Sequence, residues 1–213
     1  MTDLSKFQHP RFARMYEQIG AESERRGTAE HRDRALAGLT GRVIETGAGN
    51  GLNFDHYPDT VAEVVAVEPD DTLRAMAGAA AERANVRVRV VAGHAIALPG
   101  DDASFDAAVA SLVLCSVSDV GGALAEILRV LKPGGELRFF EHVRSDQLLY
   151  GVLQDVITPL WSRVGGGCHL NRNTAAAIEA AGFGIEQIDR FSYAPLRFFP
   201  KHSHILGRAR AAG

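Results

Sequence analysis

Three glycines alternate with other residues in the sequence Glu-Thr-Gly-Ala-Gly-Asn-Gly, which places Gly47, Gly49 and Gly51 directly after an apolar segment. Glycines between a strand and a helix let a ligand approach the backbone closely, and the helix start offers free N–H groups. The dinucleotide fingerprint G-x-G-x-x-G would require a glycine where this chain has Leu52. Glu45, two residues before the first glycine, would repel a pyrophosphate but can pair with a cationic ligand. The loop therefore favours a ligand that carries positive charge and no phosphate.

A second carboxylate stands where a ribose would be bound. Glu68 ends the apolar run 61–68, roughly 20 residues beyond the glycine loop, where an acidic side chain commonly accepts hydrogen bonds from ribose hydroxyls. S-adenosyl-L-methionine has a ribose, an ammonium group and a sulfonium but no phosphate, so we expect it as the cofactor. The residues that we expect to contact it are Tyr16, Glu45, Gly47, Gly49, Asn50, Gly51, Glu68, Pro69, Gly93, His94, Ala95, Ser111 and Leu112.

Length and composition exclude several classes of protein. The 213 residues suit one domain, and the net charge of -3 gives no general attraction to nucleic acid, which we do not expect as a partner. Two cysteines do not make a disulfide framework and suggest reduced thiols. The chain starts without a signal-peptide pattern, and no apolar run approaches the roughly 20 residues of a membrane helix. We therefore expect a cytoplasmic protein without an integral membrane segment, while its oligomeric state is not predicted.

Short apolar, β-rich runs alternate with helical segments along most of the chain. Such a pattern indicates a parallel sheet covered by helices on both faces. The last two strands, 184–193 and 202–211, are joined by a connection too short for a helical crossover, so we expect this pair to be antiparallel. The other strands are expected at 42–47, 61–68, 86–93, 105–117 and 136–143. Helices are expected within 10–39, at 70–84, at 120–135 with Pro-Gly-Gly as its end, and at 172–183 with Asn171 or Asn173 as its N-cap.

We interpret the chain as a single domain, 1–213, whose core carries two additions. Phe12, Met15, Tyr16 and Ile19 recur at helical spacing in the N-terminal segment, and aromatics and a glycine triplet mark a later insertion. Both additions are expected to close over the cofactor and exclude water. The expected segments are an N-terminal helical cap (1–40), a cofactor-binding core (42–143), an active-site insertion (145–170), and a C-terminal helix and strand pair (171–213).

Several motifs in the core resemble those of one enzyme family. The sequences ETGAGNG, the LP…SFD stretch within AGHAIALPGDDASFDAAVASLVLCSV, and EILRVLKPGGEL are similar to motifs of the class I S-adenosylmethionine-dependent methyltransferases, and they occur in the right order from about residue 42 to 143. The resemblance implies a Rossmann-like α/β fold with a mostly parallel seven-stranded sheet, an antiparallel last strand, and helices on both faces.

A narrower resemblance comes from the C-terminal part of the chain. FFEHVRS, GGGCHLNRNTAAAIEAAGF and KHSHILGRARA resemble thiol S-methyltransferases of the methyltransferase-like group. This resemblance implies methylation of a small-molecule thiol. Quinone-biosynthesis and phospholipid N-methyltransferases share part of the pattern, so O- or N-methylation of a phenol, a quinone precursor or phosphatidylethanolamine stays open as the alternative.

Methyl transfer from a sulfonium is an in-line displacement, so the protein mainly aligns the reactants. A thiol has a usable thiolate fraction near neutral pH, whereas an alcohol needs a positioned base. His142, at the end of the fifth strand, is the candidate base or orienting residue, or else pairs with a nearby carboxylate or carbonyl. Cys168, after three glycines, could contact the acceptor, could carry the methyl group, or could be structural.

The remaining candidates have simpler expected roles. Cys115 lies in an apolar run and is expected in the core, and Arg172 is expected to cap or face solvent rather than bind an anion. His202 and His204 could share one strand face, but two ligands do not make a metal site, so no metal is expected. The loop residues His169 and Asn171 stay unassigned, and the aromatics Phe139, Phe140, Trp161, Phe198 and Phe199 are expected mostly in the core, with Trp161 able to line a pocket.

Overall fold

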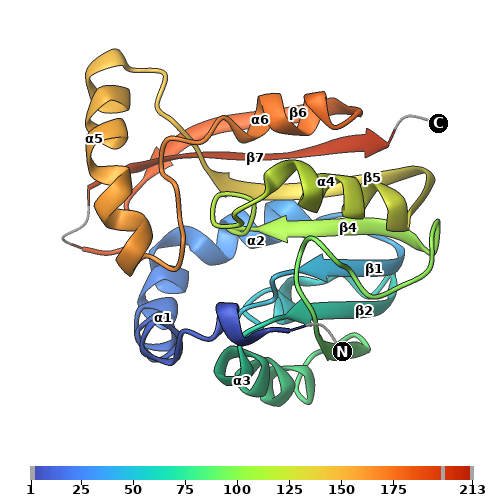
Figure 1. Ribbon diagram of the computed structural model, residues 1–213. Coiled ribbons are helices and arrows are strands. Elements are labelled where there is room, and N and C mark those ends of the chain that lie inside the picture. The colour runs from blue at the N-terminus through green and yellow to red at the C-terminus, as the bar shows by residue number, and fades with distance from the viewer. Residues whose placement is uncertain (1–2, 198–199, 212–213) are drawn as a thin grey trace.

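Seven strands form one sheet, in the order β3-β2-β1-β4-β5-β7-β6, in the computed structural model, which describes residues 3–197 and 200–211 (Figure 1). Neighbouring strands run parallel except at β7, which is antiparallel to both β5 and β6. The expected Rossmann-like sheet with its antiparallel last strand is confirmed. The strands are β1 (Gly41–Thr46), β2 (Val61–Glu68), β3 (Val88–Ala92), β4 (Phe105–Ser111), β5 (Leu131–His142), β6 (Phe183–Tyr193) and β7 (His202–Ala211).

The helices begin where polar side chains satisfy free backbone N–H groups. The Asp70 carboxylate accepts from Thr72 and Leu73 at the start of α3, and the Asp119 carboxylate accepts from Gly122 at the start of α4. Of the two candidate caps for the last helix, Asn173 makes the bond, to the Ala176 N–H. These helices are α3 (Asp71–Ala81), α4 (Val120–Val130) and α6 (Thr174–Ala180).

Successive residues of the central strands face opposite cores, as the two-residue period of a strand requires. Val43 of β1 packs into a cluster with Ala77 of α3, whereas its neighbour Ile44 packs into a second cluster with Leu124 and Ile127 of α4. All five side chains are inaccessible to solvent. The helices therefore cover both faces of the sheet, which leaves the strand ends as the place for a ligand.

Two expected boundaries were wrong, and both errors lie at the fourth and fifth strands. The apolar run after Ser111 does not continue β4, because Leu112 takes a left-handed conformation (φ 60°) and the chain turns. The backbone N–H groups of the next three residues then bond to the Glu141 carboxylate instead of a strand. The helix expected to reach residue 135 ends at Val130, and Leu131 already pairs with Phe105 as part of β5.

The N-terminal helical segment is divided into shorter pieces. A single turn, η1 (Ser5–Phe7), is followed by α1 (Pro10–Ser23), a π-helical turn η2 (Glu24–Thr28) and α2 (Ala29–Leu36). Gly27 in η2 has φ 116°, which glycine tolerates, and it marks the kink between the two long pieces. A further short turn, η3 (Phe54–His56), follows the glycine loop.

The expected insertion contains one long helix, α5 (Leu148–Val164), with an unusual distribution of side chains. Its buried positions are Gly151, Gln154 and Thr158, whereas Leu149 is 86% exposed and Val156 is 72% exposed. The Gln154 side chain donates to the carbonyls of Val143 (3.1 Å) and Leu170 (2.9 Å) and accepts from the Ser145 N–H (2.7 Å). Hydrogen bonds rather than apolar burial thus join α5 to the end of β5 and to the loop that follows the helix.

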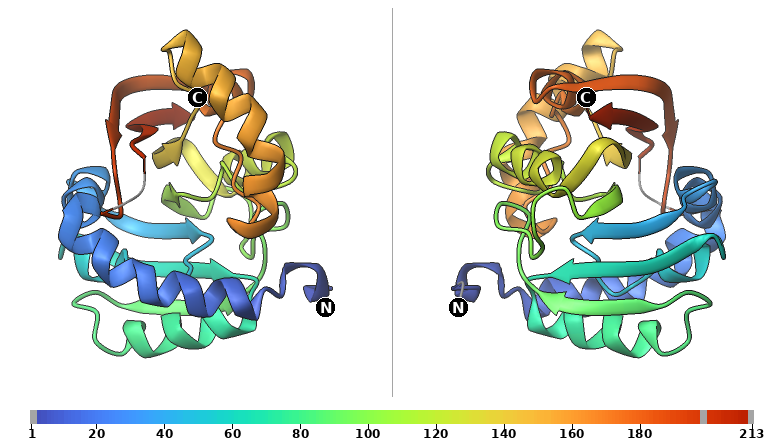
Figure 2. Two further views of the ribbon diagram at one scale, coloured as in Figure 1. Left: turned by 90° about the vertical axis from the view of Figure 1, so that its left-hand side faces the viewer. Right: turned by 90° about the vertical axis from the view of Figure 1, so that its right-hand side faces the viewer.

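The two additions to the core lie at the same end of the sheet. In Figure 1 the arrowheads of β1 and β4 point toward the side where α1 and α5 stand, and the left view of Figure 2 looks onto that side with α1 crossing below α5. Ligands bind outside the carboxyl ends of strands in open α/β sheets. The fold thus brings residues from the beginning and from the second half of the chain to this ligand-binding edge.

Candidate functional site

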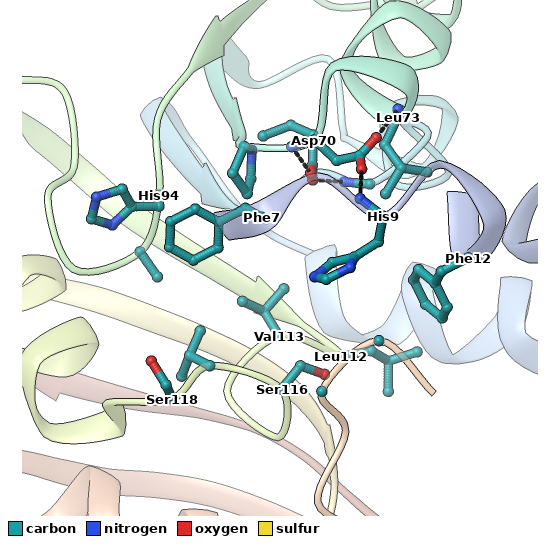
Figure 3. A pocket seen from close by; sticks show the side chains of 18 of the residues that line it. Phe7, His9, Phe12, Asp70, Leu73, His94, Leu112, Val113, Ser116 and Ser118 are labelled. Atoms are coloured by element: carbon teal, nitrogen blue, oxygen red, sulfur yellow. Dashed lines mark hydrogen bonds between the residues drawn. The ribbon is translucent and has the colours of Figure 1, made fainter. Parts of the chain in front are cut away.

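The carboxyl edge of the sheet carries two adjoining cavities. The first cavity, about 440 Å³, lies between the glycine loop, the ends of β2 and β4, and the N-terminal segment (Figure 3). Of the expected cofactor contacts, those that line it are Tyr16, Gly47, Gly49, Glu68, Pro69, His94, Ala95, Ser111 and Leu112. Most of the expected set is therefore brought together, from five separate parts of the chain.

The glycine loop follows β1 in a conformation that other residues rarely adopt. Gly47 has φ 68° and Gly49 has φ 58°. A Cβ atom on Gly47 would lie 2.6 Å from Val113, so that side of the loop leaves no room for a side chain. A Cβ atom on Gly51 would lie 2.8 Å from both Ala80 and Phe54. The first two glycines thus form the cavity wall, and Gly51 permits the loop to pack closely against α3.

Glu68 is buried at the point where β2 meets this loop. One carboxylate oxygen accepts from the Gly49 N–H at 2.7 Å, and the other accepts from the Asp70 N–H at 2.9 Å. Burial raises the pKa of Glu68 to about 7, against the lowering effect of these two bonds. The carboxylate therefore lies on the cavity wall, held by backbone on both sides.

The residues just before α1 form part of the wall of this cavity, and sequence reasoning had not singled them out within the expected N-terminal cap. The His9 N–H donates to Asp70 at 2.6 Å, the Gln8 side chain donates to the Pro69 carbonyl at 2.9 Å, and the Phe7 ring stacks on His94 with centroids 5.1 Å apart (Figure 3). No local pattern in the sequence marks these polar residues as part of a site. They reach the cavity only because the N-terminal segment packs against the loop that follows β2.

Four of the expected cofactor residues are not brought to the first cavity: Glu45, Asn50, Gly51 and Gly93. The Glu45 carboxylate points into the protein and accepts from Asn53 (2.7 Å) and Tyr57 (2.9 Å), and burial raises its pKa to about 7. A Cβ atom on Gly93 would lie 2.9 Å from Val67, which gives that glycine a packing role at the end of β3. Glu45 stands two residues before the first glycine of the loop, and this short spacing had suggested a ligand contact. Because each side chain of β1 faces one of the two cores, the Glu45 carboxylate points into the protein instead.

The second cavity, about 290 Å³, adjoins the first. The two share Phe12 and Tyr16 of α1 and Leu112 and Ser116 of the turn after β4. Much of its remaining wall is apolar, with Ile19, Leu52, Trp161, Val164 and Leu196 among the lining side chains. The expectation that Trp161 could line an apolar pocket agrees with this position, and Phe139 and Phe140 are fully buried as expected. Phe198 and Phe199 lie outside the described residues.

Three side chains with nucleophilic or basic atoms meet at the wall of the second cavity. Nδ1 of His142 lies 3.6 Å from Sγ of Cys115 and 3.6 Å from Sγ of Cys168, and the two sulfurs are 3.7 Å apart. Both cysteines are buried and free of disulfide bonds. Sequence reasoning had placed Cys115 in the apolar core, where it is fully buried, and had named only His142 and Cys168 as catalytic candidates.

Comparison with known proteins identifies the family. A family model described as a methyltransferase domain matches residues 44–139. Thiol S-methyltransferase TMT1B of Rattus norvegicus is 37% identical over 171 residues, which cover 78% of this chain and 69% of that protein. The chain belongs to the TMT1B family of S-adenosylmethionine-dependent methyltransferases. S-adenosylmethionine is accordingly its cofactor.

Two further relatives of this methyltransferase show how far the similarity extends. Demethylmenaquinone methyltransferase of Roseiflexus castenholzii is 35% identical over 130 residues, which cover 59% of this chain and 55% of that protein. The crystal structure of an S-adenosylmethionine-dependent methyltransferase of Thermotoga maritima superposes with a TM-score of 0.72, covering 94% of this chain and 96% of that chain at 23% identity. The fold is thus shared well beyond the range of close sequence similarity.

The first cavity of the methyltransferase fits this cofactor. A buried carboxylate at Glu68 and left-handed glycines at Gly47 and Gly49 meet at one end, and the stacked rings of Phe7 and His94 stand on another part of the wall. Glu68 can accept hydrogen bonds from hydroxyl groups, the glycine backbone leaves room for the ligand, and the two rings offer a flat surface.

The described residues include no helix that is long and apolar enough to cross a membrane.

Glu141 of the methyltransferase is a supporting residue that sequence reasoning had not singled out. Its fully buried carboxylate accepts from the N–H groups of Val113 (3.0 Å), Leu114 (2.8 Å) and Cys115 (3.0 Å). Burial raises the pKa of Glu141 well above its ordinary value. The glutamate of the E-H-V motif thus shapes the turn that separates the two cavities, and its place before His142 was the signal available in the sequence.

Polar residues after the glycine triplet hold the Cys168 loop against the same turn. The His169 N–H donates to the Cys115 carbonyl at 2.8 Å, and the Arg172 guanidinium donates to the carbonyls of Leu114 and Val117, the latter at 2.9 Å. The Asn171 side chain donates to Asp155 of α5 at 3.1 Å. Arg172, expected to cap a helix or to face solvent, instead binds the backbone of the turn.

The two histidines of β7 lie next to His142 on the same side of the sheet. His204 pairs with His142 in the β5–β7 register, and the rings of His142 and His204 have centroids 4.5 Å apart. Burial lowers the pKa of His202 to about 4 and that of His204 well below its ordinary value, which keeps both neutral. His202 also lines the second cavity. In the described part of the chain, the metal-ligating atoms that converge are those of Cys115, His142 and Cys168 rather than those of this pair.

Proposed function

We propose that this methyltransferase methylates a small, apolar thiol or hydrogen sulfide bound in the second cavity. The observation that carries the proposal is that the two cavities adjoin, with Tyr16, Leu112 and Ser116 in the walls of both. An acceptor in the second cavity would therefore face a methyl group presented from the first. A volume of about 290 Å³ suits a small molecule.

The chemistry of the second cavity supports a thiol as the acceptor. The Arg32 guanidinium on its wall pairs with Glu24 at 3.0 Å, so this cation is already neutralised. His142 contacts two sulfur atoms through Nδ1, which is not the arrangement of a base oriented by a carboxylate. A thiol forms its nucleophile without a strong base, whereas a phenol or an alcohol depends on one. The similarity to TMT1B points in the same direction.

The chain's own residues would bind the reactants and exclude water. When bound, S-adenosylmethionine supplies a methyl group already activated on its sulfonium, so direct in-line displacement needs mainly alignment. Glu68 would accept hydrogen bonds from the ribose hydroxyls, and the backbone at Gly47 and Gly49 would accommodate the methionine end. His142 would orient the acceptor. Cys168 would contact the acceptor without itself receiving the methyl group.

The two additions to the core would form the cover of the site within one domain. Residues 1–40 contribute Phe12 and Tyr16 to both cavities, and residues 145–170 contribute Trp161 and Cys168 to the second. Their joint position at the carboxyl edge supports closure over the reactants. The low cysteine count, two in the chain, supports a reducing compartment such as the cytoplasm.

A methyl-transfer screen tests the acceptor. Purified protein is incubated with radiolabelled S-adenosylmethionine and, in parallel, with alkyl thiols, sulfide, phenols, a demethylated quinone and phosphatidylethanolamine vesicles. We expect efficient transfer to apolar thiols or sulfide, and slower transfer in a Glu68→Ala control when the cofactor is below saturation. Efficient methylation of a phenol, the quinone or the lipid amine with thiols left unmethylated would contradict the proposal, and the similarity to demethylmenaquinone methyltransferase makes the quinone the first competitor.

A further inference from the structure

Two sulfurs and one imidazole nitrogen form a nearly equilateral triangle at the wall of the second cavity. Its sides are 3.6 Å (Cys115 Sγ to His142 Nδ1), 3.6 Å (Cys168 Sγ to His142 Nδ1) and 3.7 Å (between the sulfurs). The three side chains come from the turn after β4, the end of β5 and the loop after α5. Convergence of three potential ligand atoms from three segments requires an explanation beyond the packing of any one element.

The sides of this triangle match the edges of a zinc coordination tetrahedron. Zinc lies about 2.3 Å from a thiolate sulfur and about 2.0–2.1 Å from an imidazole nitrogen, so tetrahedral angles place two sulfurs about 3.8 Å apart and a sulfur about 3.6 Å from the nitrogen. Two cysteines and one histidine are also a donor set that zinc favours over magnesium or calcium. The three atoms therefore stand where three ligands of one zinc ion would stand.

The backbone around these ligands is fixed by hydrogen bonds. The Cys115 N–H donates to Glu141 at 3.0 Å, the Cys115 carbonyl accepts from the His169 N–H at 2.8 Å, and the Cys168 N–H donates to the Gly165 carbonyl at 3.1 Å. Such supporting contacts orient ligands in metal sites. Little rearrangement of the chain would be needed for a metal ion to enter.

We infer that Cys115, His142 and Cys168 bind one zinc ion whose fourth coordination position opens into the second cavity. All three residues line that cavity, so a ligand bound there can reach the ion. Zinc sites with three protein ligands keep a water or a substrate in the fourth position. This inference departs from the expectation that the chain has no metal site, which considered only the spacing of His202 and His204.

The fourth position suits the acceptor, and this step rests on the proposed function. A thiol that replaces the water on zinc forms a sulfur–zinc bond, loses its proton to solvent and releases the water. The bound sulfur is then a thiolate held beside the first cavity, and zinc lowers the pKa at which it forms. A thioether product carries no negative charge on sulfur and binds zinc weakly, so it would be released.

Metal binding is tested directly on the full chain without any acceptor. The protein is purified under reducing conditions, treated with a chelator, and titrated with Zn²⁺ in competition with a chromophoric chelator and separately with Co²⁺. We expect one ion per chain and a thiolate-to-cobalt charge-transfer absorption, which Cys115 and Cys168 alone can supply because the chain has 2 cysteines. Zinc should also protect both thiols from alkylation in the wild-type protein, a readout that needs no variant.

Variants assign the ion to the three residues. Cys115→Ser, Cys168→Ser and His142→Ala should each weaken zinc binding by more than about tenfold. His56→Gln removes an imidazole of η3 that contacts Asp33 and Glu24 rather than the two sulfurs, and it should leave zinc binding unchanged. Binding of S-adenosylhomocysteine and the unfolding midpoint report whether each variant is folded. Absence of zinc binding by the reduced wild-type protein, a cobalt spectrum unaffected by Cys168→Ser, or isolation of a Cys115–Cys168 disulfide from protein that binds no metal would overturn the inference.

The acceptor screen separates this inference from the proposed function. Methylation of thiols by a chelator-treated protein that binds no zinc would overturn the metal site and leave the acceptor class intact. Zinc binding by a protein that methylates only a phenol or an amine would overturn the acceptor class and leave the metal site intact. If both hold, removal of zinc should lower turnover with thiols at least about tenfold and leave the affinity for S-adenosylhomocysteine unchanged.

Discussion

The carboxylate of Glu68 accepts a hydrogen bond from the backbone N–H of Gly49 at 2.7 Å and so joins the end of β2 to the glycine loop. Its other oxygen accepts from the Asp70 N–H, at the start of α3. One buried side chain thereby sets the position of two walls of the first cavity. Changes at Glu68 should therefore alter cofactor binding through both direct contact and loop position.

Replacement of Glu68 by alanine should weaken binding of S-adenosylhomocysteine by about 1–3 kcal/mol, the scale of a lost charge-assisted hydrogen-bond partner. Isothermal titration calorimetry measures the change. Glu63→Ala is the matched control, because Glu63 lies on the same strand but pairs with Arg42 away from the cavity. Equal affinity of the Glu68→Ala and wild-type proteins would remove Glu68 from the cofactor site.

Cofactor affinity should fall as the pH is lowered through 7. Burial raises the pKa of Glu68 to about 7 in the folded protein, so the carboxylate is ionised at pH 8 and protonated at pH 6. The ribose hydroxyls bond better to the ionised form, which makes binding of S-adenosylhomocysteine weaker at pH 6 by up to about tenfold. Glu68→Gln should flatten this profile, and a slope that persists in that variant would assign the titration to another group.

The backbone at Gly47 should tolerate no side chain. Alanine there would combine a left-handed φ of 68° with a Cβ contact of 2.6 Å to the Val113 side chain, so either the loop or Val113 must shift, and both line the cavity. Gly38→Ala is a matched control, because Gly38 has φ 75° but nothing within 4 Å of its added Cβ. Both variants should lose some stability, as thermal unfolding would show.

Only Gly47→Ala should also lose cofactor affinity, by at least about tenfold, since its clash lies on the cavity wall. Equilibrium binding of S-adenosylhomocysteine distinguishes the two substitutions. Equal losses of affinity in Gly47→Ala and Gly38→Ala would show that the effect comes from general destabilisation instead of from the shape of the loop.

Replacement of Gln154 should impair binding of the acceptor in the second cavity more than binding of the cofactor in the first. Gln154→Ala leaves the Val143 and Leu170 carbonyls and the Ser145 N–H without their buried partner, which should lower the free energy of unfolding by about 1–3 kcal/mol. The Cys168 loop would lose one of its attachments to α5 and keep the bond from Asn171 to Asp155. KM for the acceptor should therefore rise while affinity for S-adenosylhomocysteine stays constant.

The exposed Gln147, from the turn before the same helix, supplies the control, and Gln147→Ala should change neither quantity. Chemical denaturation and steady-state kinetics measure the two effects. A loss of cofactor affinity in Gln154→Ala equal to the loss for the acceptor would show that α5 supports both cavities alike.

Local sequence patterns predict the sheet and most of the residues that line the first cavity. Strand order along the chain, the antiparallel end and the contribution of Glu68 follow from local patterns, because a strand's period and a glycine's conformational freedom act over a few residues. The same locality explains the errors. The run after Ser111 is apolar enough for a strand, but the distant Glu141 carboxylate takes its N–H groups and turns the chain.

Tertiary structure alone decided which side chains meet at the carboxyl edge. Glu45 stands two residues from the glycine loop yet faces Asn53 and Tyr57 inside the protein, whereas Cys115 and Cys168 are 53 residues apart yet lie in contact. Spacing along a chain specifies neighbours on one element, but a pocket between elements depends on how the turn after β4 and the loop after α5 pack together. The second cavity and its three converging ligand atoms arise from that packing, which no local pattern encodes.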